Sequence, residues 1–404
     1  MTLIECYTDL PIHNIAACLR LHPEKLVFVG DGEKIHQQKR RYEKILHPRG
    51  LRPEITVCDT HSKDFDEIRA SMERILNSDD SCVIDLTGGD EPVIMALGGA
   101  LAKLSPERRK KVQVQRLDLA TQTVHDCLND NRLVPGKLVC LSIEELFYLH
   151  GGSLYSADYQ PPAAFNAKKL DTLWQIVSDS PREWNNGISY LNEFKNRADS
   201  SGKESVPLEK LRGSRADFAE KEPVIRHLLE QLHQNGIIRL RASGDGLEYQ
   251  FTDPIYRYCA LKAGNILELK TLLEARELLD NGAPFFHECL MGVSIDWDGK
   301  TNAPDLRSPE TRNEIDVVAV HGIAPLFISC KNGTVDETEL YKLHTVATRF
   351  AGPLARKMLI ATELSQKNKE AITQRAEDMG VLLIPNAAEL TKQQWREAFR
   401  KVMQ

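Results

Sequence analysis

The chain has 404 residues, of which 42% are hydrophobic and 27% are charged, and its formal net charge at pH 7 is −6. This composition predicts two or three globular domains and excludes a disordered or fibrous chain. The negative charge excludes a surface coated with basic residues, although one domain could still carry a basic patch. Because no run of eighteen apolar residues occurs and the stretch MTLIECYTDL lacks a signal-peptide pattern, we expect neither a membrane span nor secretion.

Nine cysteines are scattered singly, with no CxxC motif and no Cys/His spacing typical of a zinc site. Several lie inside apolar runs, as in ITVCD, SCVIDL and KLVCL. Buried free thiols of this kind are typical of a reducing compartment, so we expect a cytoplasmic protein without disulfides.

Residues 1–150 alternate short apolar runs with helical patterns, which predicts an α/β domain with a mostly parallel, Rossmann-like doubly wound sheet. We expect strands at LIECY, KLVFVG, EITVCD, CVIDLTGG and VQVQRLD, and helices over 12–21, 34–46, 65–76 and 92–104. Such sheets bind ligands at the carboxyl ends of their strands. The residues predicted to bind a ligand there are Thr8, Asp9, Leu10, Gly30, Asp31, Gly32, Thr87, Gly88, Gly89 and Asp90.

The turn after the fourth expected strand contains Gly88 and Gly89 and is followed by a helix that we expect to start at Pro92. Glycines let the backbone approach a ligand, and the free N–H groups of a helix start favour an anion. A tight turn is the simpler explanation of the glycines alone, but their position after a central strand favours a ligand site. Asp90 fits a helix N-cap as well as a ligand contact. The absence of G-x-G-x-x-G and G-x-x-x-x-G-K-[ST] argues against NAD and NTPase sites.

Residues 151–264 form a linker and a region that we expect to resemble a winged helix. The stretch GGSLYSADYQPPAA has the Gly, Ser and Pro content of a linker. EPVIRHLLEQLHQNG predicts a helix that stops at Asn235-Gly236, and IIRLRASGDGLEYQFTD predicts a hairpin with a polar tip. A helix followed by such a strand pair is the plan of a winged helix.

Residues 265–404 predict a second, separate α/β domain. A helix over 265–282 is expected to end at Asn281-Gly282, and PFFHECLMGV could continue as a second helix. Strands are expected at VSIDWDG, 315–320, 325–330, RKMLIATE and VLLIPN. Helices are expected at ETELYKLHTVATRFAG, 369–379 and TKQQWREAFRKV.

The hairpin NEIDVVAVHGIAPLFISCKNG carries a carboxylate at one end and an amine at the other. If its turn is centred between Ile323 and Ala324, Asp316 lies opposite Lys331 on one face. The simple interpretation is a cross-strand ion pair. The alternative is a metal-dependent phosphodiesterase site, in which Asp316 binds a divalent cation and Lys331 orients water or stabilises charge on phosphate.

Further groups are expected around this second site. Glu288, on the possible helix before the hairpin, would supply a second carboxylate ligand. The side chain of Cys330 is expected in the core, while its backbone carbonyl could be a metal ligand. Glu339 and Tyr341, on the next helix, could face the same cleft, but a solvated helix face is the favoured interpretation.

Two motifs resemble known families. DLTGG after an apolar strand resembles the signature of the CRISPR-associated Rossmann-fold (CARF) sensor domains, although Asp90 and Glu91 stand where members often carry Thr and then Lys or Arg. NEIDVV and ISCKNG resemble the PD-(D/E)xK restriction-endonuclease-like fold. Here Ser329 stands where that family has its second carboxylate, so Glu288 would have to compensate.

Together the two resemblances imply an endonuclease of type III CRISPR antiviral defence. They imply a homodimer activated by cyclic oligoadenylate, above all cyclic tetra-adenylate, that uses Mn²⁺ or Mg²⁺. Single-stranded DNA or RNA and supercoiled DNA that becomes nicked are the implied substrates. One alternative is a ligand-responsive winged-helix DNA-binding regulator with an inert nuclease-like domain, although the hairpin tip SGDG lacks basic residues. Another is a sensor that degrades its own ligand without a metal.

Overall fold

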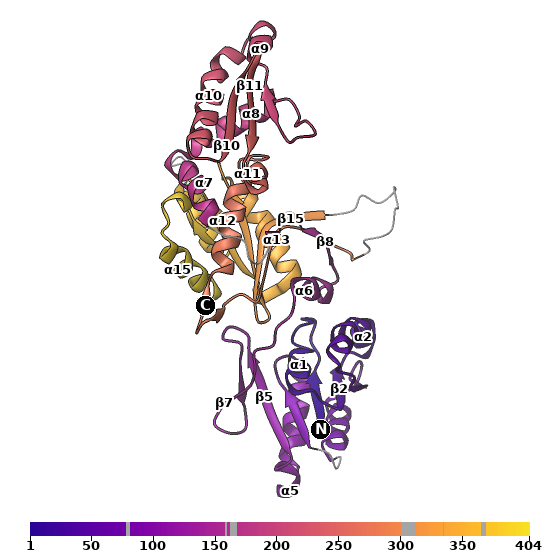
Figure 1. The fold of residues 1–404 in the computed structure, drawn as a ribbon. Helices are drawn as coiled ribbons and strands as arrows, with labels where there is room; N and C mark the ends of the chain where they lie inside the picture. The colour runs from indigo at the N-terminus through magenta and orange to yellow at the C-terminus, as the bar shows by residue number, and fades with distance from the viewer. Residues whose placement is uncertain (78–80, 158–159, 162–167, 300–311, 334, 365–368) are drawn as a thin grey trace.

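The computed structural model of the protein describes residues 1–404 except 78–80, 158–159, 162–167, 300–311, 334 and 365–368. Three parts are stacked along one long axis: an N-terminal α/β domain, the C-terminal α/β domain in the centre, and a smaller unit at the far end (Figure 1). The expected α/β fold class is confirmed. Among the helices in the described part of the chain, none is both long and apolar enough to cross a membrane.

The N-terminal domain contains a seven-stranded sheet in the order β3-β2-β1-β4-β5-β6-β7. The strands are β1 (Thr2–Cys6), β2 (Lys25–Gly30), β3 (Glu54–Asp59), β4 (Cys82–Asp85), β5 (Val112–Asp118), β6 (Thr123–Asp126) and β7 (Arg132–Val134). The first five are parallel, whereas β6 and β7 add an antiparallel edge that the sequence analysis did not predict. The strand order reverses between β1 and β4, so a ligand crevice is expected at their carboxyl ends.

Helices cover both faces of this sheet, as predicted. They are α1 (Ala16–Leu21), α2 (Gly32–Leu46), η1 (His47–Arg49), α3 (Phe65–Leu76), α4 (Glu91–Ala102), α5 (Pro106–Arg109) and α6 (Ile143–Leu149). α1 and α2 share a hydrophobic cluster with Leu3 and Phe28, whereas α3 and α4 share another with Ile4 and Ile84. Neighbouring residues of a strand point to opposite faces, so Leu3 and Ile4 pack against different helix pairs.

The smaller unit combines helices with a three-stranded sheet in the order β10-β11-β9. Its elements are α7 (Lys168–Asp179), α8 (Pro181–Phe194), β9 (Glu204–Val206), α9 (Leu208–Ser214), α10 (Phe218–Gln234), β10 (Ile238–Ser243), β11 (Gly246–Phe251) and α11 (Pro254–Cys259). α10 is capped by Asn235, and Gly236 follows with φ 71°, as the predicted helix stop requires. β10 and β11 form the predicted hairpin, with Ser243 opposite Gly246, so this unit has a winged-helix-like plan.

The C-terminal domain has a six-stranded mixed sheet in the order β18-β17-β16-β15-β14-β8. Its strands are β8 (Ser153–Ala157), β14 (Glu288–Asp296), β15 (Arg312–His321), β16 (Ala324–Lys331), β17 (Arg356–Ala361) and β18 (Leu382–Ile384). Its other elements are α12 (Asn265–Arg276), β12 (Leu279–Asp280), β13 (Ala283–Pro284), α13 (Glu337–Ala351), η2 (Gly352–Leu354), α14 (Lys369–Asp378), η4 (Ala387–Glu389) and α15 (Lys392–Met403). β16, β17 and β18 are parallel, and the remaining pairs are antiparallel.

Three segments differ from the prediction. Residues 153–157, expected within the linker, form the edge strand β8 beside β14. Asn281-Gly282 does not end a long helix but forms the β12–β13 turn, with φ values of 49° and 82° that suit a tight hairpin. Residues 288–296 form β14, although a second helix was an option for 284–293 and a strand was expected only from 293. A short apolar run is compatible with either structure, so periodicity could not decide.

The C-terminal domain is not packed separately, because two hydrophobic clusters join it to both other parts. One contains residues of α8, α10, α12 and one face of β16, including Ile328. The other contains residues of α2, α6 and the opposite face of β16. Phe147 of α6 has ring-centroid distances of 6.3 Å to Phe327 and 5.4 Å to Phe350. α6 therefore packs between the N-terminal domain and the sheet that carries Asp316 and Lys331.

Candidate functional sites

The carboxyl ends of the central parallel strands surround a cavity of about 240 Å³ in the N-terminal domain. Its lining residues are Tyr7, Thr8, Asp9, Asp31, Lys34, Thr60, His61, Ser62 and Asp90. Thr8, Asp9, Asp31 and Asp90 were among the ten predicted ligand residues. The cavity lies at the strand ends where doubly wound sheets bind ligands, so the prediction and the geometry point to one place.

Carboxylates outnumber cations around this cavity. Lys34 Nζ lies 2.9 Å from Asp9 Oδ2, and this interaction raises the pKa of Lys34. Asp31 accepts two backbone N–H groups at the start of α2 and lies 3.9 Å from His61 Nδ1. Asp90 stands at the N-cap position of α4, but its side chain accepts no capping hydrogen bond. These acceptors suit hydroxyl and amino groups of a ligand better than bare phosphate oxygens.

The predicted glycines are required by packing around the cavity. A Cβ on Gly88 would lie 2.5 Å from Thr8 Cγ2, and Gly89 adopts φ 112°. Gly30 and Gly32, which precede and open α2, are confined in the same way by neighbouring side chains. The glycines therefore allow the turns to close around the cavity, and their presence alone does not require a ligand.

Six of the ten predicted residues do not line the cavity. Four of them are the glycines, and the other two, Thr87 and Leu10, have side chains with contacts elsewhere. Thr87 Oγ1 accepts the N–H of Leu117 at 2.9 Å and so ties the end of β4 to β5. Leu10 faces the C-terminal domain, since a Cβ on Gly352 of η2 would lie 3.2 Å from its Cδ2. Both side chains connect the cavity wall to other parts of the protein.

The predicted pairing of Asp316 with Lys331 is wrong, because the turn was placed one residue too late in the chain. β15 and β16 join through Gly322-Ile323, so the turn is centred one residue earlier than expected. Continuing the observed register places Ser329, and not Lys331, across from Asp316. A hairpin turn sets the register of both strands, and a one-residue error in the turn changes every cross-strand pair.

Asp316 is a buried carboxylate that β16 holds in place. Its Oδ2 accepts the backbone N–H of Cys330 at 2.5 Å and the hydroxyl of Ser329 at 3.2 Å. Ser329 therefore donates to the acid in place of supplying a second carboxylate. Burial raises the pKa of Asp316, although the Cys330 hydrogen bond and the charge of Lys331 act in the opposite direction.

Lys331 lies between two carboxylates at the end of β16. Its Nζ is 2.8 Å from Glu339 Oε2 on α13. Burial opposes its charge, but the hydrogen bond with Glu339 and the nearby charge of Asp316 outweigh burial and raise the pKa of Lys331. The expected solvated position of Glu339 is therefore wrong, since its side chain is only 21% exposed. Tyr341, 46% exposed, does lie on a solvated face.

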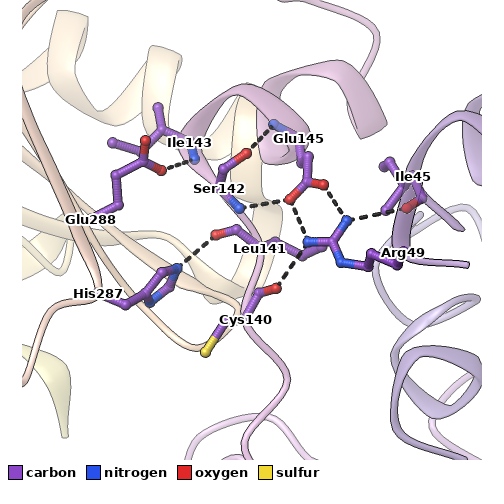
Figure 2. A network of polar contacts seen from close by, with 9 residues as sticks. All are labelled: Ile45, Arg49, Cys140, Leu141, Ser142, Ile143, Glu145, His287 and Glu288. Carbon is purple, nitrogen blue, oxygen red and sulfur yellow. Dashed lines mark hydrogen bonds and ion pairs between the residues drawn. The ribbon is translucent and has the colours of Figure 1, made fainter.

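Glu288 does not reach this site. It begins β14, where it lies opposite Val320 of β15, four residues along the strand from Asp316. Its carboxylate accepts the N–H of Ile143 at 2.6 Å, at the N-terminus of α6, where the helix dipole favours a negative charge (Figure 2). The prediction that Glu288 lies on a helix and joins Asp316 is wrong, because the segment is a strand that places Glu288 far along the hairpin.

Glu268, on α12, is a second carboxylate whose charge acts on Cys330. The charges of Asp316 and Glu268 both raise the pKa of the Cys330 thiol, so both carboxylates lie near that side chain. Cys330 itself is buried and lies 3.5 Å from Thr271 Oγ1 of α12, as expected for a core residue. The sequence analysis chose Glu288, on a helix expected just before the hairpin, although it also predicted the helix over 265–282 that contains Glu268.

The residues present are compatible with a divalent cation bound mainly through one or two carboxylates. No cluster of three or more His, Cys, Asp or Glu side chains in the described ranges could by itself hold a metal ion. Mg²⁺, however, commonly uses one or two carboxylates together with water and substrate phosphate. The negative charge of Glu314 also raises the pKa of Asp316. A bound cation would offset the repulsion between these two carboxylates. Asp316 is therefore the carboxylate of this site that fits such a cation, which would need further oxygen donors.

A cavity of about 340 Å³ begins one residue beyond Lys331. It lies between α8 of the smaller unit and the ends of β16 and β17. Its lining residues are Pro181, Arg182, Asn185, Asn332, Gly333, Thr362 and Glu363. Asn185 Nδ2 donates to the carbonyl of Asn332 at 2.8 Å and so joins the two walls. This polar space, shared by two parts of the protein, adjoins the residue after Lys331, although the Lys331 side chain itself does not line it.

Comparison with solved structures identifies the fold. Protein VC1899 from Vibrio cholerae matches with a TM-score of 0.70 and 15% identity, over 100% of this chain and 97% of the other. Can2 from Sulfobacillus thermosulfidooxidans, solved in complex with cyclic tetra-adenylate, matches with a TM-score of 0.66 and 14% identity, over the same shares. The chain has their fold. The match covers the whole length of this chain.

Other comparisons add nothing to this. A type III CRISPR defence DNA nuclease activated by cyclic oligoadenylate matches at a TM-score of 0.49 and 15% identity, over 90% of this chain and 46% of the other, and we draw nothing from it. No protein-family model matches the chain. No curated protein matches it either.

Proposed function

We propose that the protein is a divalent-metal-dependent endonuclease that a cyclic oligoadenylate, above all cyclic tetra-adenylate, activates in type III CRISPR antiviral defence. The observation that carries the proposal is the placing of Lys331 between Asp316 and Glu339 at the end of a buried hairpin. A lysine held there is suited to act on a phosphodiester, and the Can2 structure with this fold contains cyclic tetra-adenylate. The lysine site and the fold shared with Can2 are combined in one chain of 404 residues.

The N-terminal cavity is the proposed activator site. Thr8, Asp9, Asp31 and Asp90 would accept hydrogen bonds from ribose hydroxyls and adenine amino groups, and Lys34 would contact a phosphate after releasing Asp9. One cavity of about 240 Å³ is small for a ring of four nucleotides. We therefore propose a homodimer in which two such cavities face each other and share one ligand.

Each residue of the second site has a distinct proposed role. Lys331 stabilises the negative charge that develops on the phosphate and can orient the attacking water. Glu339 holds the Lys331 side chain toward the site and keeps it protonated. Ser329 and the Cys330 N–H fix the orientation of the Asp316 carboxylate. A substrate strand would enter through the polar cavity beyond Lys331.

Asp316 and Glu268 would hold the cation, with the Cys330 carbonyl as a possible third oxygen donor. A bound Mn²⁺ or Mg²⁺ would polarise the phosphate and lower the pKa of a bound water. The proposed substrates are single-stranded nucleic acid and supercoiled DNA, which would be nicked. The proposed location is the cytoplasm, in agreement with nine free cysteines.

A plasmid-nicking assay tests the proposal. Supercoiled plasmid is incubated with the protein and Mn²⁺, with and without cyclic tetra-adenylate, beside Lys331→Ala and Asp316→Asn. We expect nicking that depends on the ligand and is lost in both variants. Duplex binding without cleavage would support the winged-helix regulator, and ligand breakdown that survives loss of Lys331 would support a self-degrading sensor.

A further inference from the structure

The tip of the β15–β16 hairpin is held by a side chain of the N-terminal domain. Gln122, in the loop between β5 and β6, donates from Nε2 to the carbonyl of His321 at 2.9 Å. Its Oε1 accepts the N–H of Ile323 at 3.0 Å. One amide therefore binds both sides of the turn that joins the strands carrying Asp316 and Lys331. This turn lies almost 200 residues after Gln122 in the chain.

The two hydrogen bonds of the Gln122 amide allow only one orientation of this group. A carbonyl can only accept and an N–H can only donate, so the Gln122 amide cannot be turned round without losing both bonds. Gly322 lies directly under the amide, and a Cβ on it would overlap Gln122 Oε1. The adjoining N–H of Leu141, which precedes α6, donates to the Gly322 carbonyl at 3.1 Å. The turn is thus held by three hydrogen bonds from outside its own domain.

The loop that carries Gln122 is itself well defined. Asp118 Oδ1 accepts the N–H groups of Ala120 and Thr121 at 2.9 and 3.0 Å. Gln122 adopts φ 54°, a left-handed conformation that non-glycine residues seldom take. Surrounding contacts therefore hold the loop in one shape, so movement of β5 would carry Gln122 with it.

β5 is also tied to the wall of the candidate activator site. Thr87, directly before Gly88 and Gly89, accepts the N–H of Leu117 on β5. Leu117 is followed by Asp118, which shapes the loop of Gln122. A continuous set of contacts therefore runs from the turn beside the cavity, along β5, to the hairpin tip.

We propose that Gln122 is a positioning residue that sets the place of the β15–β16 hairpin according to the state of the N-terminal domain. The inference rests on the proposed function, since it assigns the route by which the activator site controls the nuclease site. Gln122 touches neither substrate nor metal and acts only through the hairpin. Its removal should loosen the hairpin tip and weaken activation, while cleavage by already aligned sites continues.

Two measurements on the full-length homodimer test this inference with Gln122→Ala. The first is amide hydrogen exchange of the peptides covering 316–331, which we expect to be at least about threefold faster at the tip. The second is the ratio of plasmid nicking with and without cyclic tetra-adenylate, which we expect to fall about tenfold, equivalent to about 1.4 kcal/mol of coupling. The KM for DNA should change by less than about twofold, because the substrate contacts are elsewhere.

Matched variants separate positioning from general stability. Gln393→Ala removes the same side chain from an exposed position on α15 and should behave as wild type in both measurements. Gln122→Glu keeps the volume and the acceptor for Ile323 but sets a carboxylate oxygen against the His321 carbonyl, so it should resemble Gln122→Ala. Unchanged exchange in Gln122→Ala, or faster exchange with an unchanged nicking ratio, would overturn the inference. If the wild-type protein nicks no DNA, the proposed function fails, and the exchange data still decide whether Gln122 holds the tip.

Discussion

The two candidate sites are built in different ways. The N-terminal cavity collects residues that each follow a parallel strand, so the order of the strands brings Thr8, Asp31 and Asp90 together. The C-terminal site depends on one hairpin register and on helices α12 and α13 approaching from other parts of the chain. The first kind of site tolerates small errors in element boundaries. The second changes its members when a turn moves by a single residue.

The largest expected effect is at Lys331, which has no substitute on the hairpin. Lys331→Ala should lower activated nicking by about 10²–10³-fold, because a positioned cation that stabilises transition-state charge is lost. Initial rates on supercoiled plasmid measure this. Lys342→Ala is the matched control, since Lys342 also contacts Glu339 but is 62% exposed, and its rate should stay within about twofold of wild type.

In the N-terminal site the largest effect should be steric. Gly88→Ala should lower the free energy of unfolding by about 1–3 kcal/mol, because its Cβ would meet Thr8 and the Cys6 carbonyl. Urea denaturation measures the change. Gly98→Ala, inside α4 with open space around the added Cβ, should raise stability by up to about 1 kcal/mol. Equal effects at the two positions would contradict the account of the cavity wall.

Glu339→Gln tests the helix contact that sequence reasoning missed. The folded-state pKa of Lys331 is raised, so the ammonium form is present below it and lost as pH rises through it. Removing the Glu339 charge lowers that pKa, and the alkaline fall in nicking rate should begin at a lower pH, with a loss of up to about tenfold at the alkaline end of the profile. A pH–rate profile measures this. An alkaline limb that stays in place would show that Glu339 does not control Lys331.

The smallest effect on nicking is expected at Glu288. Glu288→Gln retains an oxygen that can accept the Ile143 N–H (Figure 2). The residue lies four positions along the strand pair from Asp316. Activated nicking should therefore stay within about twofold of wild type. Asp316→Asn, measured in parallel, should lose nearly all activity. Similar losses in the two variants would indicate that Glu288 is a metal ligand after all.

Local pattern was sufficient for much of the fold. Buried runs such as KLVFVG and VQVQRLD are strands with the expected ends, and the helix stop at Asn235-Gly236 is where it was predicted. The runs of 284–293 and 281–282 were misassigned, because short apolar segments and Asn-Gly pairs occur in more than one kind of structure. The correct assignment of β14 depends on its pairing with β15, and that of Asn281-Gly282 on the short β12–β13 pair. Local pattern contains neither contact.

In the candidate sites, too, local pattern predicted some residues, whereas others depend on contacts made only in the folded protein. Asp316 and Lys331 were found as a pair because each is an unexpected charge beside an apolar strand. In the structure, Asp316 accepts a hydrogen bond from Ser329, and Lys331 forms an ion pair with Glu339. The first contact depends on the turn at Gly322-Ile323 and the second on the packing of α13. Glu268 was missed for the same reason, since its helix meets the hairpin only in the folded protein.

The most direct test of the whole account is the initial rate of Mn²⁺-dependent plasmid nicking as the concentration of cyclic tetra-adenylate is raised, for wild-type protein and Asp316→Asn. The account predicts a saturable rise in the wild-type rate and no rise in the variant. A wild-type rate that is the same with and without the ligand, or a rise that persists in Asp316→Asn, would contradict it.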